Sequence, residues 1–236
     1  MSLRTSLINL TGYWMYKLNR LPIGCDLIPD IKLKIQMPVR TIFDVGANTG
    51  QTVKRFIKAF PEAKIYSFEP VAATYSLLKK NTETLANVSC YHEALGEQIG
   101  DTEITTFSGK DSLLNSLKNQ DPVSMKKGGT AETIHVNTGD AFSSKHGIEY
   151  IDLLKIDTEG FELEVLKGSV DLLKSSKIKA IYCEVGFNRT NKQNTYLNDV
   201  LDFLNPYGYE FYGLYDLYNK RMKAGTDYGS VLFVKP

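Results

Sequence analysis

The sequence predicts an α/β protein whose central sheet is mostly parallel and is covered by helices on both faces. From residue 39 onward, short apolar segments alternate with segments whose apolar residues recur at helical spacing. Glycine or acidic residues follow most of the apolar segments, where the carboxyl ends of the strands are expected. Because ligands of open α/β sheets bind outside those ends, the same residues predict a site there.

The first half of the predicted sheet alternates strand and helix regularly. Runs rich in β-branched and aromatic residues predict the strands, and Pro61 ends the first helix because proline cannot continue a helix interior. The predicted elements are a strand at 39–45, a helix at 50–60, a strand at 64–68, a helix at 72–85 and a strand at 87–92.

The alternation is interrupted between residues 96 and 138. Strands are predicted at 102–107 and 132–137, and the polar stretch KDSLLNSLKNQDPVSMKKGGT lies between them. A long irregular connection of this kind is usually a lid, a binding loop or a disordered segment. We expect substrate selection to involve this stretch.

The second half resumes the alternation and ends in an antiparallel hairpin. The predicted elements are a strand at 151–156, a helix at 161–174, a strand at 178–185, a helix at 194–204 and strands at 209–214 and 230–234. Two short, aromatic or β-branched strands late in the chain are typical of a hairpin at a sheet edge. No linker divides residues 39–236, which are therefore predicted to form one domain.

Residues 1–38 are predicted to form a helical extension. Leu3, Leu7, Leu10, Trp14 and Leu18 recur at helical spacing. This pattern favours a helix that packs on its own domain or on a partner subunit of a homo-oligomer, over a helix lying in a membrane interface. The start lacks the features of a secretory signal, and no run approaches the roughly 18 apolar residues of a transmembrane segment.

Charge and cysteine content narrow the classes of partner. The formal net charge is +1, which argues against nucleic acid binding, because that function normally requires a strongly basic surface. Cys25, Cys90 and Cys183 are widely spaced and predict neither a disulfide framework nor a zinc site. A reducing, cytoplasmic location is the expected compartment.

The stretch TIFDVGANTGQTV at 41–53 predicts a strand, a glycine turn and a helix start. Such a turn lets backbone N–H groups approach a nucleotide closely. The dinucleotide fingerprint requires a second glycine two residues after the first, but Asn48 follows Gly46 at that spacing and the next glycine is Gly50. The turn is therefore nucleotide-like without the feature that admits a pyrophosphate.

Acidic residues at the strand ends indicate the ligand. Glu69 follows the turn by about twenty residues, the spacing at which a carboxylate accepts the ribose hydroxyls of a nucleoside. Asp44 is placed to meet a cationic amino group. Glu93, Asp157 with Glu159, and Glu184 end further strands. An anionic site of this kind suits a nucleoside that carries an ammonium and a sulfonium, namely S-adenosylmethionine.

Four motifs make the sequence resemble the FkbM family of S-adenosylmethionine-dependent methyltransferases over roughly residues 39–234. The motifs are DVGANTG, SFEP at 67–70, HEALG at 92–96 and, most specifically, LLKIDTEGFELEVLKGS at 153–169. The resemblance implies a Rossmann-like class I methyltransferase fold, with a mostly parallel sheet, a late antiparallel strand and helices on both faces.

The resemblance also implies roles for individual residues. It places Asp44, Gly46, Asn48 and Gly50 along the methionine and ribose of the cofactor, Glu69 at the ribose hydroxyls, Glu93 and Ala94 beside adenine, and Asp157 near the reacting methyl with Glu159 or Glu184 nearby. The alternatives are structural: Asp157 and Glu159 can cap the following helix, and Glu184 can be a surface residue at a strand end.

The expected reaction is methyl transfer to a hydroxyl oxygen of a sugar, a glycoconjugate or another small natural product. Either a carboxylate accepts the hydroxyl proton as a general base, or several carboxylates hold a divalent metal such as Mg²⁺. Methylation of a base amino group is less favoured, because Asp157 is followed by Thr158, Glu159 and Gly160 where such enzymes have Pro-Pro and an aromatic residue.

Two other function classes remain open from the sequence. A nicotinamide-dependent oxidoreductase shares the sheet and an acidic residue at the position of Glu69, but it should have a glycine where Asn48 stands. A non-catalytic regulatory module would bind the cofactor and use the N-terminal helix as a docking surface.

Overall fold

The computed structural model describes residues 10–11, 16–17, 20–106, 130–191, 193–218 and 225–236. The chain divides into two compact units, Met1–Pro38 and Val39–Pro236. In the first unit, a short helix α2 (Leu27–Pro29) leads into a π-helix η2 (Asp30–Ile35). Most of the helix predicted at 3–21 lies outside the described residues.

A seven-stranded sheet forms the centre of the second unit, in the order β3-β2-β1-β7-β8-β10-β9. β10 is antiparallel to both of its neighbours, and the other pairs are parallel, so the predicted fold class is confirmed. The strands are β1 (Thr41–Val45), β2 (Lys64–Phe68), β3 (Val88–Tyr91), β7 (Ile151–Ile156), β8 (Ile178–Gly186), β9 (Glu210–Tyr218) and β10 (Tyr228–Val234).

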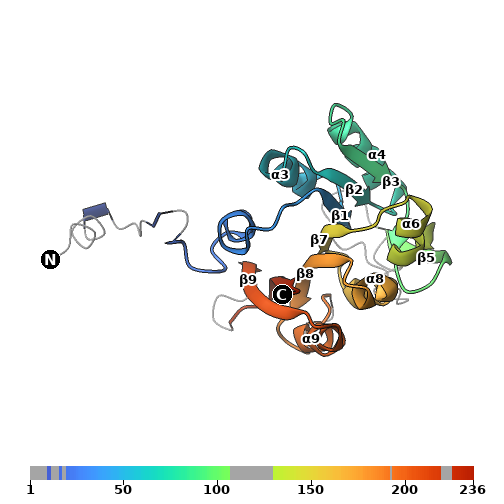
Figure 1. Cartoon of the computed structure of the whole chain (residues 1–236). Coiled ribbons are helices and arrows are strands. Elements are labelled where there is room, and N and C mark those ends of the chain that lie inside the picture. The colour runs from blue at the N-terminus through green and yellow to red at the C-terminus, as the bar shows by residue number, and fades with distance from the viewer. Residues whose placement is uncertain (1–9, 12–15, 18–19, 107–129, 192, 219–224) are drawn as a thin grey trace. The chain divides into compact units, whose positions relative to one another are not determined.

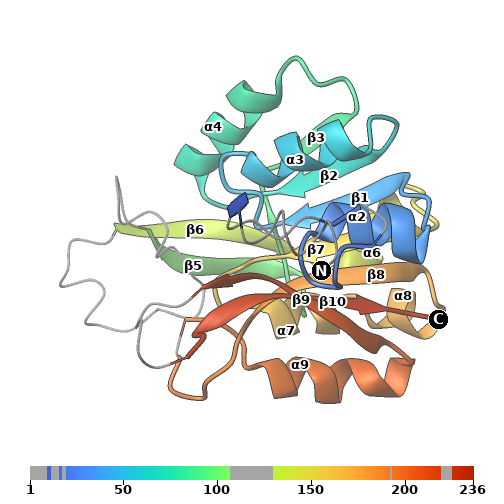
Figure 2. The same cartoon turned by 90° about the vertical axis from the view of Figure 1, so that its left-hand side faces the viewer.

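Helices cover both faces of this sheet, as predicted. The helices are α3 (Gln51–Ala59), α4 (Ala72–Thr82), α6 (Gly139–Lys145), α7 (Glu162–Lys167), α8 (Val170–Lys174) and α9 (Leu197–Leu204), followed by the 3-10 turn η4 (Asn205–Tyr207). Figure 1 shows α3 and α4 on one side of the sheet and α6, α8 and α9 on the other. Figure 2 shows the same separation of α3 and α4 from α7 and α9.

Helix α6 was not predicted from the sequence. It has only seven residues, GDAFSSK, and Thr138 caps it by accepting a hydrogen bond from Ala141 N. Its Phe142 is fully buried, with ring centroids 4.7 Å from those of Phe68 and Tyr91. One buried aromatic residue therefore anchors the helix, and so short a segment has too few apolar residues to show a helical period.

Three predicted helices differ from the observed ones. The helix predicted at 161–174 is divided into α7 and α8 at Gly168, where a Cβ atom would lie 1.8 Å from the carbonyl oxygen of Gly96. The helix predicted at 72–85 ends at Thr82. The helix predicted at 194–204 begins at Leu197, and the side chains of Asn194 and Thr195 donate to glutamates of the candidate site instead.

A small second sheet has the order β4-β6-β5. It consists of β4 (Ala94–Leu95), β5 (Gly100–Thr106) and β6 (Thr130–Asn137), so the two strands predicted here are confirmed (Figure 2). Residues 107–129, which include nearly all of the predicted selection loop, lie outside the described residues. None of the helices that the structure describes is long and apolar enough to cross a membrane.

Candidate active site

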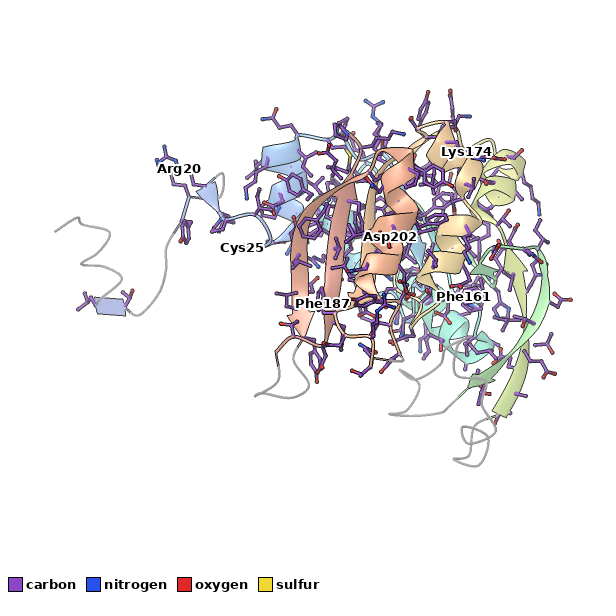
Figure 3. The ribbon with its side chains drawn as sticks, turned by 90° about the horizontal axis from the view of Figure 1, so that it is seen from below. Arg20, Cys25, Phe161, Lys174, Phe187 and Asp202 are labelled. Atoms are coloured by element: carbon purple, nitrogen blue, oxygen red, sulfur yellow. The ribbon has the colours of Figure 1, made fainter. Side chains whose placement is uncertain are left out.

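A cavity of about 330 Å³ lies where β1, β2, β7 and β8 end. Figure 3 shows Phe161 and Phe187, which follow β7 and β8, at about the same level and well below Lys174 at the end of α8. The lining residues are Val45, Gly46, Ala47, Asn48, Gln51, Thr52, Phe68, Glu69, Pro70, Val71, Thr74, Ala94, Leu95, Ile104, Lys155, Asp157, Thr158, Glu159, Phe161 and Glu184. The cavity thus occupies the edge of the sheet where the sequence predicts a ligand site.

The turn after β1 requires glycine at position 46. Gly46 has φ +73°, and its N–H and that of Ala47 donate to the carbonyl oxygen of Phe68 at 3.1 and 3.0 Å. Asp157 N donates to the carbonyl oxygen of Val45 at 3.1 Å, which draws the end of β7 against the turn. A Cβ atom on Gly46 would lie 1.8 Å from the Asp157 carbonyl oxygen, so any side chain there would displace the backbone.

Asn48 and Gly50 complete the turn in different ways. Both have positive φ, +49° for Asn48 and +91° for Gly50. Asn48 tolerates this conformation because its Oδ1 accepts a hydrogen bond from Thr49 N at 2.8 Å. Gly50 starts α3 and faces Leu78 and Thr82, away from the cavity.

Glu69 is held rigidly beside the turn. Its Oε2 accepts a hydrogen bond from Asn48 N at 3.0 Å, and its Oε1 accepts one from Val71 N at 3.1 Å. Burial raises the pKa of Glu69 to about 7, although both N–H donors act in the opposite direction. The carboxylate therefore has a fixed orientation and changes its charge near neutral pH.

Lys155 is a buried cation in the lining of the cavity. Its Nζ lies 3.0 Å from Asp44 Oδ1 and 3.7 Å from Asp157 Oδ2, and it donates to the carbonyl oxygen of Gly46 at 2.8 Å. Burial lowers the pKa of Lys155, but the carboxylates of Asp44 and Asp157 outweigh that effect and the net shift is upward. The ammonium of Lys155 therefore interacts with three parts of the site: the glycine turn, Asp44 of the first strand and the predicted catalytic residue Asp157.

Asp157, Glu159 and Glu184 form an acidic cluster whose ligand oxygens lie within 4.8 Å of one another. Burial is the largest cause and the charge of Asp157 the second, and together they raise the pKa of Glu159 to about 7 and that of Glu184 to about 9. Such a cluster favours binding a proton or a cation. The oxygen donors fit a hard divalent ion such as Mg²⁺.

Glu162 secures the loop that contains Asp157 and Glu159. It is fully buried, and its Oε1 accepts hydrogen bonds from Thr158 N at 3.0 Å, Thr158 Oγ1 at 3.1 Å and Gly160 N at 3.0 Å. Glu159 has φ +54° in this loop, a conformation that non-glycine residues rarely adopt. The glutamate after the loop thus holds a strained backbone in place.

The cavity collects most of the predicted site residues. It is lined by Gly46, Asn48, Glu69, Ala94, Asp157, Glu159 and Glu184. Asp44, Gly50 and Glu93 are not among its lining residues. Asp44 is instead buried against Lys155, and Glu93 accepts a hydrogen bond from Asn137 Nδ2 at 3.2 Å.

Sequence reasoning did not assign roles to Lys155 and Glu162. Both lie inside LLKIDTEGFELEVLKGS. A signal for Lys155 is its charge within the otherwise apolar end of a strand, since an unpaired lysine is almost never fully buried. Glu162 has no comparable signal, because an acidic residue in the first turn of a helix is ordinary.

The sheet order, the antiparallel β10 and the cavity at the strand ends are those of a Rossmann-like class I methyltransferase fold. Residues 44–211 match the methyltransferase FkbM domain. The chain belongs to this family, as the sequence resemblance predicted.

Named relatives include two methyltransferases. The methyltransferase sdnD of Sordaria araneosa is 32% identical over 155 residues, which are 54% of this chain and 59% of sdnD. The 2-O-methyltransferase NoeI of Sinorhizobium fredii is 23% identical over 180 residues, 72% of this chain and 73% of NoeI. The chain thus spans less than two thirds of sdnD.

The solved structures that match the chain include fibrillarin of Aeropyrum pernix with bound S-adenosylmethionine. The two sequences are 14% identical, the matched region covers 84% of this chain and 67% of the fibrillarin chain, and the TM-score is 0.47. The family assignment rests on the sequence match alone.

Proposed function

We propose that the protein transfers the methyl group of S-adenosylmethionine to a hydroxyl oxygen of a sugar, a glycoconjugate or another small natural product. One observation supports this most strongly: a single cavity is lined both by Glu69 beside the glycine turn and by the acidic cluster Asp157, Glu159 and Glu184. The first feature suits a nucleoside and the second suits activation of a hydroxyl. Membership of a methyltransferase family favours this reaction over nicotinamide chemistry.

The residues present fit the proposed cofactor. Gly46 and Asn48 bring the backbone of the turn to the cavity surface, and Glu69 beside them would present a carboxylate of fixed orientation to ribose hydroxyls. Lys155 is the single basic residue among the described lining residues, and its ammonium is already engaged by carboxylates. The excess of acidic over basic residues in the cavity lining therefore favours a sulfonium cation. Ala94 also lines the cavity, as expected for a neighbour of adenine.

The bound cofactor would supply a methyl group on an activated leaving group, and the chain would align the acceptor and remove its proton. In the in-line displacement a carbon–oxygen bond forms as the carbon–sulfur bond breaks, and S-adenosylhomocysteine leaves. Asp157 or Glu159 would accept the hydroxyl proton as a general base. The same carboxylates with Glu184 could instead hold a divalent metal ion, which would lower the pKa of the hydroxyl.

The test is incubation with methyl-labelled S-adenosylmethionine and a panel of sugars, glycolipids and hydroxylated small molecules. We expect label on the oxygen of at least one acceptor, and a large loss of turnover in Asp157→Asn with cofactor affinity retained. Chelation with and without added Mg²⁺ separates the two activation routes. Binding of NAD without any response to S-adenosylmethionine in calorimetry would overturn the proposal. Cofactor binding without transfer to any acceptor would favour the regulatory alternative.

A further inference from the structure

Three consecutive residues before α9 each donate a side-chain hydrogen bond to a different glutamate. Gln193 Nε2 donates to Glu159 Oε2 at 2.8 Å, and Asn194 Nδ2 donates to Glu184 Oε2 at 2.6 Å. Thr195 Oγ1 donates to Glu162 Oε2 at 2.5 Å. These residues, which we call the donor segment (Gln193–Thr195), thus contact two members of the acidic cluster and the glutamate that secures its loop.

The donor segment is firmly attached to the end of β8. Gly186 N donates to the carbonyl oxygen of Thr195 at 2.8 Å. Asn191 Oδ1 accepts hydrogen bonds from Gln193 N at 2.9 Å and Asn194 N at 3.2 Å, which folds the segment into a tight turn. The three side chains therefore project from a backbone that is itself constrained.

Starting helix α9 does not account for these contacts. The residue that caps α9 is Tyr196, and no side chain makes the capping hydrogen bond. Thr195 has a hydroxyl of the type that caps helices, yet it donates to Glu162, which is fully buried and lies 33 residues away in the chain. The polar side chains are directed to the site and not to the helix that they precede.

We propose that Gln193, Asn194 and Thr195 are positioning residues for the methyl transfer. Gln193 and Asn194 set the planes of the Glu159 and Glu184 carboxylates, and Thr195 acts through Glu162 on the loop from Asp157 to Gly160. This inference rests on the proposed function. A carboxylate displaced by about 1 Å can reduce a rate 10²-fold, and none of the three residues lines the cavity. Their loss should therefore lower turnover and leave cofactor affinity unchanged.

The experiment compares Gln193→Met, Asn194→Ala, Thr195→Val and Thr195→Ser with the wild type. Methionine and valine keep the approximate side-chain shape and remove the donor, and serine restores the hydroxyl of Thr195. Asn198→Ala is the matched control, because Asn198 is an exposed residue of α9. Each protein is assayed for kcat and KM with labelled S-adenosylmethionine and the acceptor found for the wild type, for cofactor Kd by calorimetry, and for Tm.

We expect kcat to fall at least tenfold in Gln193→Met, Asn194→Ala and Thr195→Val, with cofactor Kd within twofold of the wild type. Thr195→Ser and the control should retain wild-type kcat. If Thr195→Val unfolds because Glu162 Oε2 loses its hydroxyl donor, the Gln193→Met variant provides the decisive test, since Gln193 is only partly buried. Wild-type kcat in that variant overturns this inference and leaves the proposed function intact, whereas a wild type that methylates no acceptor overturns both.

Discussion

Gly46 and Asp157 belong to different strands, yet a Cβ atom on the first would lie 1.8 Å from the carbonyl oxygen of the second. The end of β7 is therefore packed directly against the turn that follows β1. This contact joins the proposed cofactor-binding turn to the proposed catalytic loop, and it makes position 46 sensitive to any side chain.

Gly46→Ala should lower both stability and cofactor affinity. The positive φ alone costs alanine about 1–2 kcal/mol, and the clash with Asp157 adds to this. Gly147→Ala is the matched control, because Gly147 has φ +62° and nothing within 4 Å of its would-be Cβ atom. Urea unfolding and calorimetry measure the two effects. Equal destabilisation of the two variants would contradict the contact.

Lys155→Met should destabilise the protein by about 3–5 kcal/mol, because it leaves Asp44 buried without its compensating charge. Within the described residues, no group other than Lys155 donates a hydrogen bond to either carboxylate oxygen of Asp44, so nothing replaces the lysine. The double variant Lys155→Met with Asp44→Asn should recover part of the loss. Chemical denaturation of the wild type, the two single variants and the double variant gives the coupling free energy between Lys155 and Asp44. Additive effects of the two substitutions would show that the residues do not stabilise each other.

Cofactor affinity should increase as the pH rises through about 7. In the proposed complex the carboxylate form of Glu69 would accept hydrogen bonds from the ribose hydroxyls, and burial raises the pKa of this group to about 7. Below that pH the group is mostly protonated, so affinity should fall by up to about tenfold per pH unit. Glu69→Gln should bind weakly and show a flatter profile. Calorimetry between pH 5.5 and 8.5 checks both, and an identical slope in the two proteins would exclude Glu69 as the titrating group.

The ligand-free protein should become less stable as the pH rises from about 4.5 to about 9. Burial raises the pKa of Glu184 to about 9 in the folded state from the ordinary value of 4.5. Between these values the folded state binds more protons than the unfolded state, so the free energy of unfolding falls with increasing pH. Glu184→Gln should flatten this slope. Denaturation curves at several pH values in the presence of a chelator provide the measurement, and an unchanged slope would show that Glu184 titrates normally.

Local patterns predict the part of the fold that depends on burial and turn chemistry. The strands at 64–68 and 151–156 have the predicted bounds, because each is a short apolar run with a clear polar end. The glycine turn is also recognisable from the sequence, because Gly46 and Gly50 have positive φ, a conformation that favours glycine over other residues. Strand ends then place Glu69 and Asp157 at one edge of the sheet without knowledge of any contact.

Contacts between segments that are distant in the chain produce no recognisable pattern in the sequence. Lys155 acquires its role from Asp44, which is 111 residues earlier in the chain, and Thr195 acquires its role from Glu162. The sequence predicts that Asn194 and Thr195 start a helix, because Asn and Thr are ordinary residues at such a position. Which side chain accepts their hydrogen bonds is decided by the tertiary fold.

The position of β10 has a consequence for how the sheet is completed during synthesis. β9 precedes β10 in the chain, but in the sheet β10 lies between β8 and β9 and pairs with both. A nascent chain that has reached β9 therefore still exposes the backbone edge of β8, and β9 lacks its neighbour in the ladder. Unpaired edges of this kind promote association with other chains. Chaperone dependence and aggregation should therefore be greatest in the interval before residues 228–234 leave the ribosome.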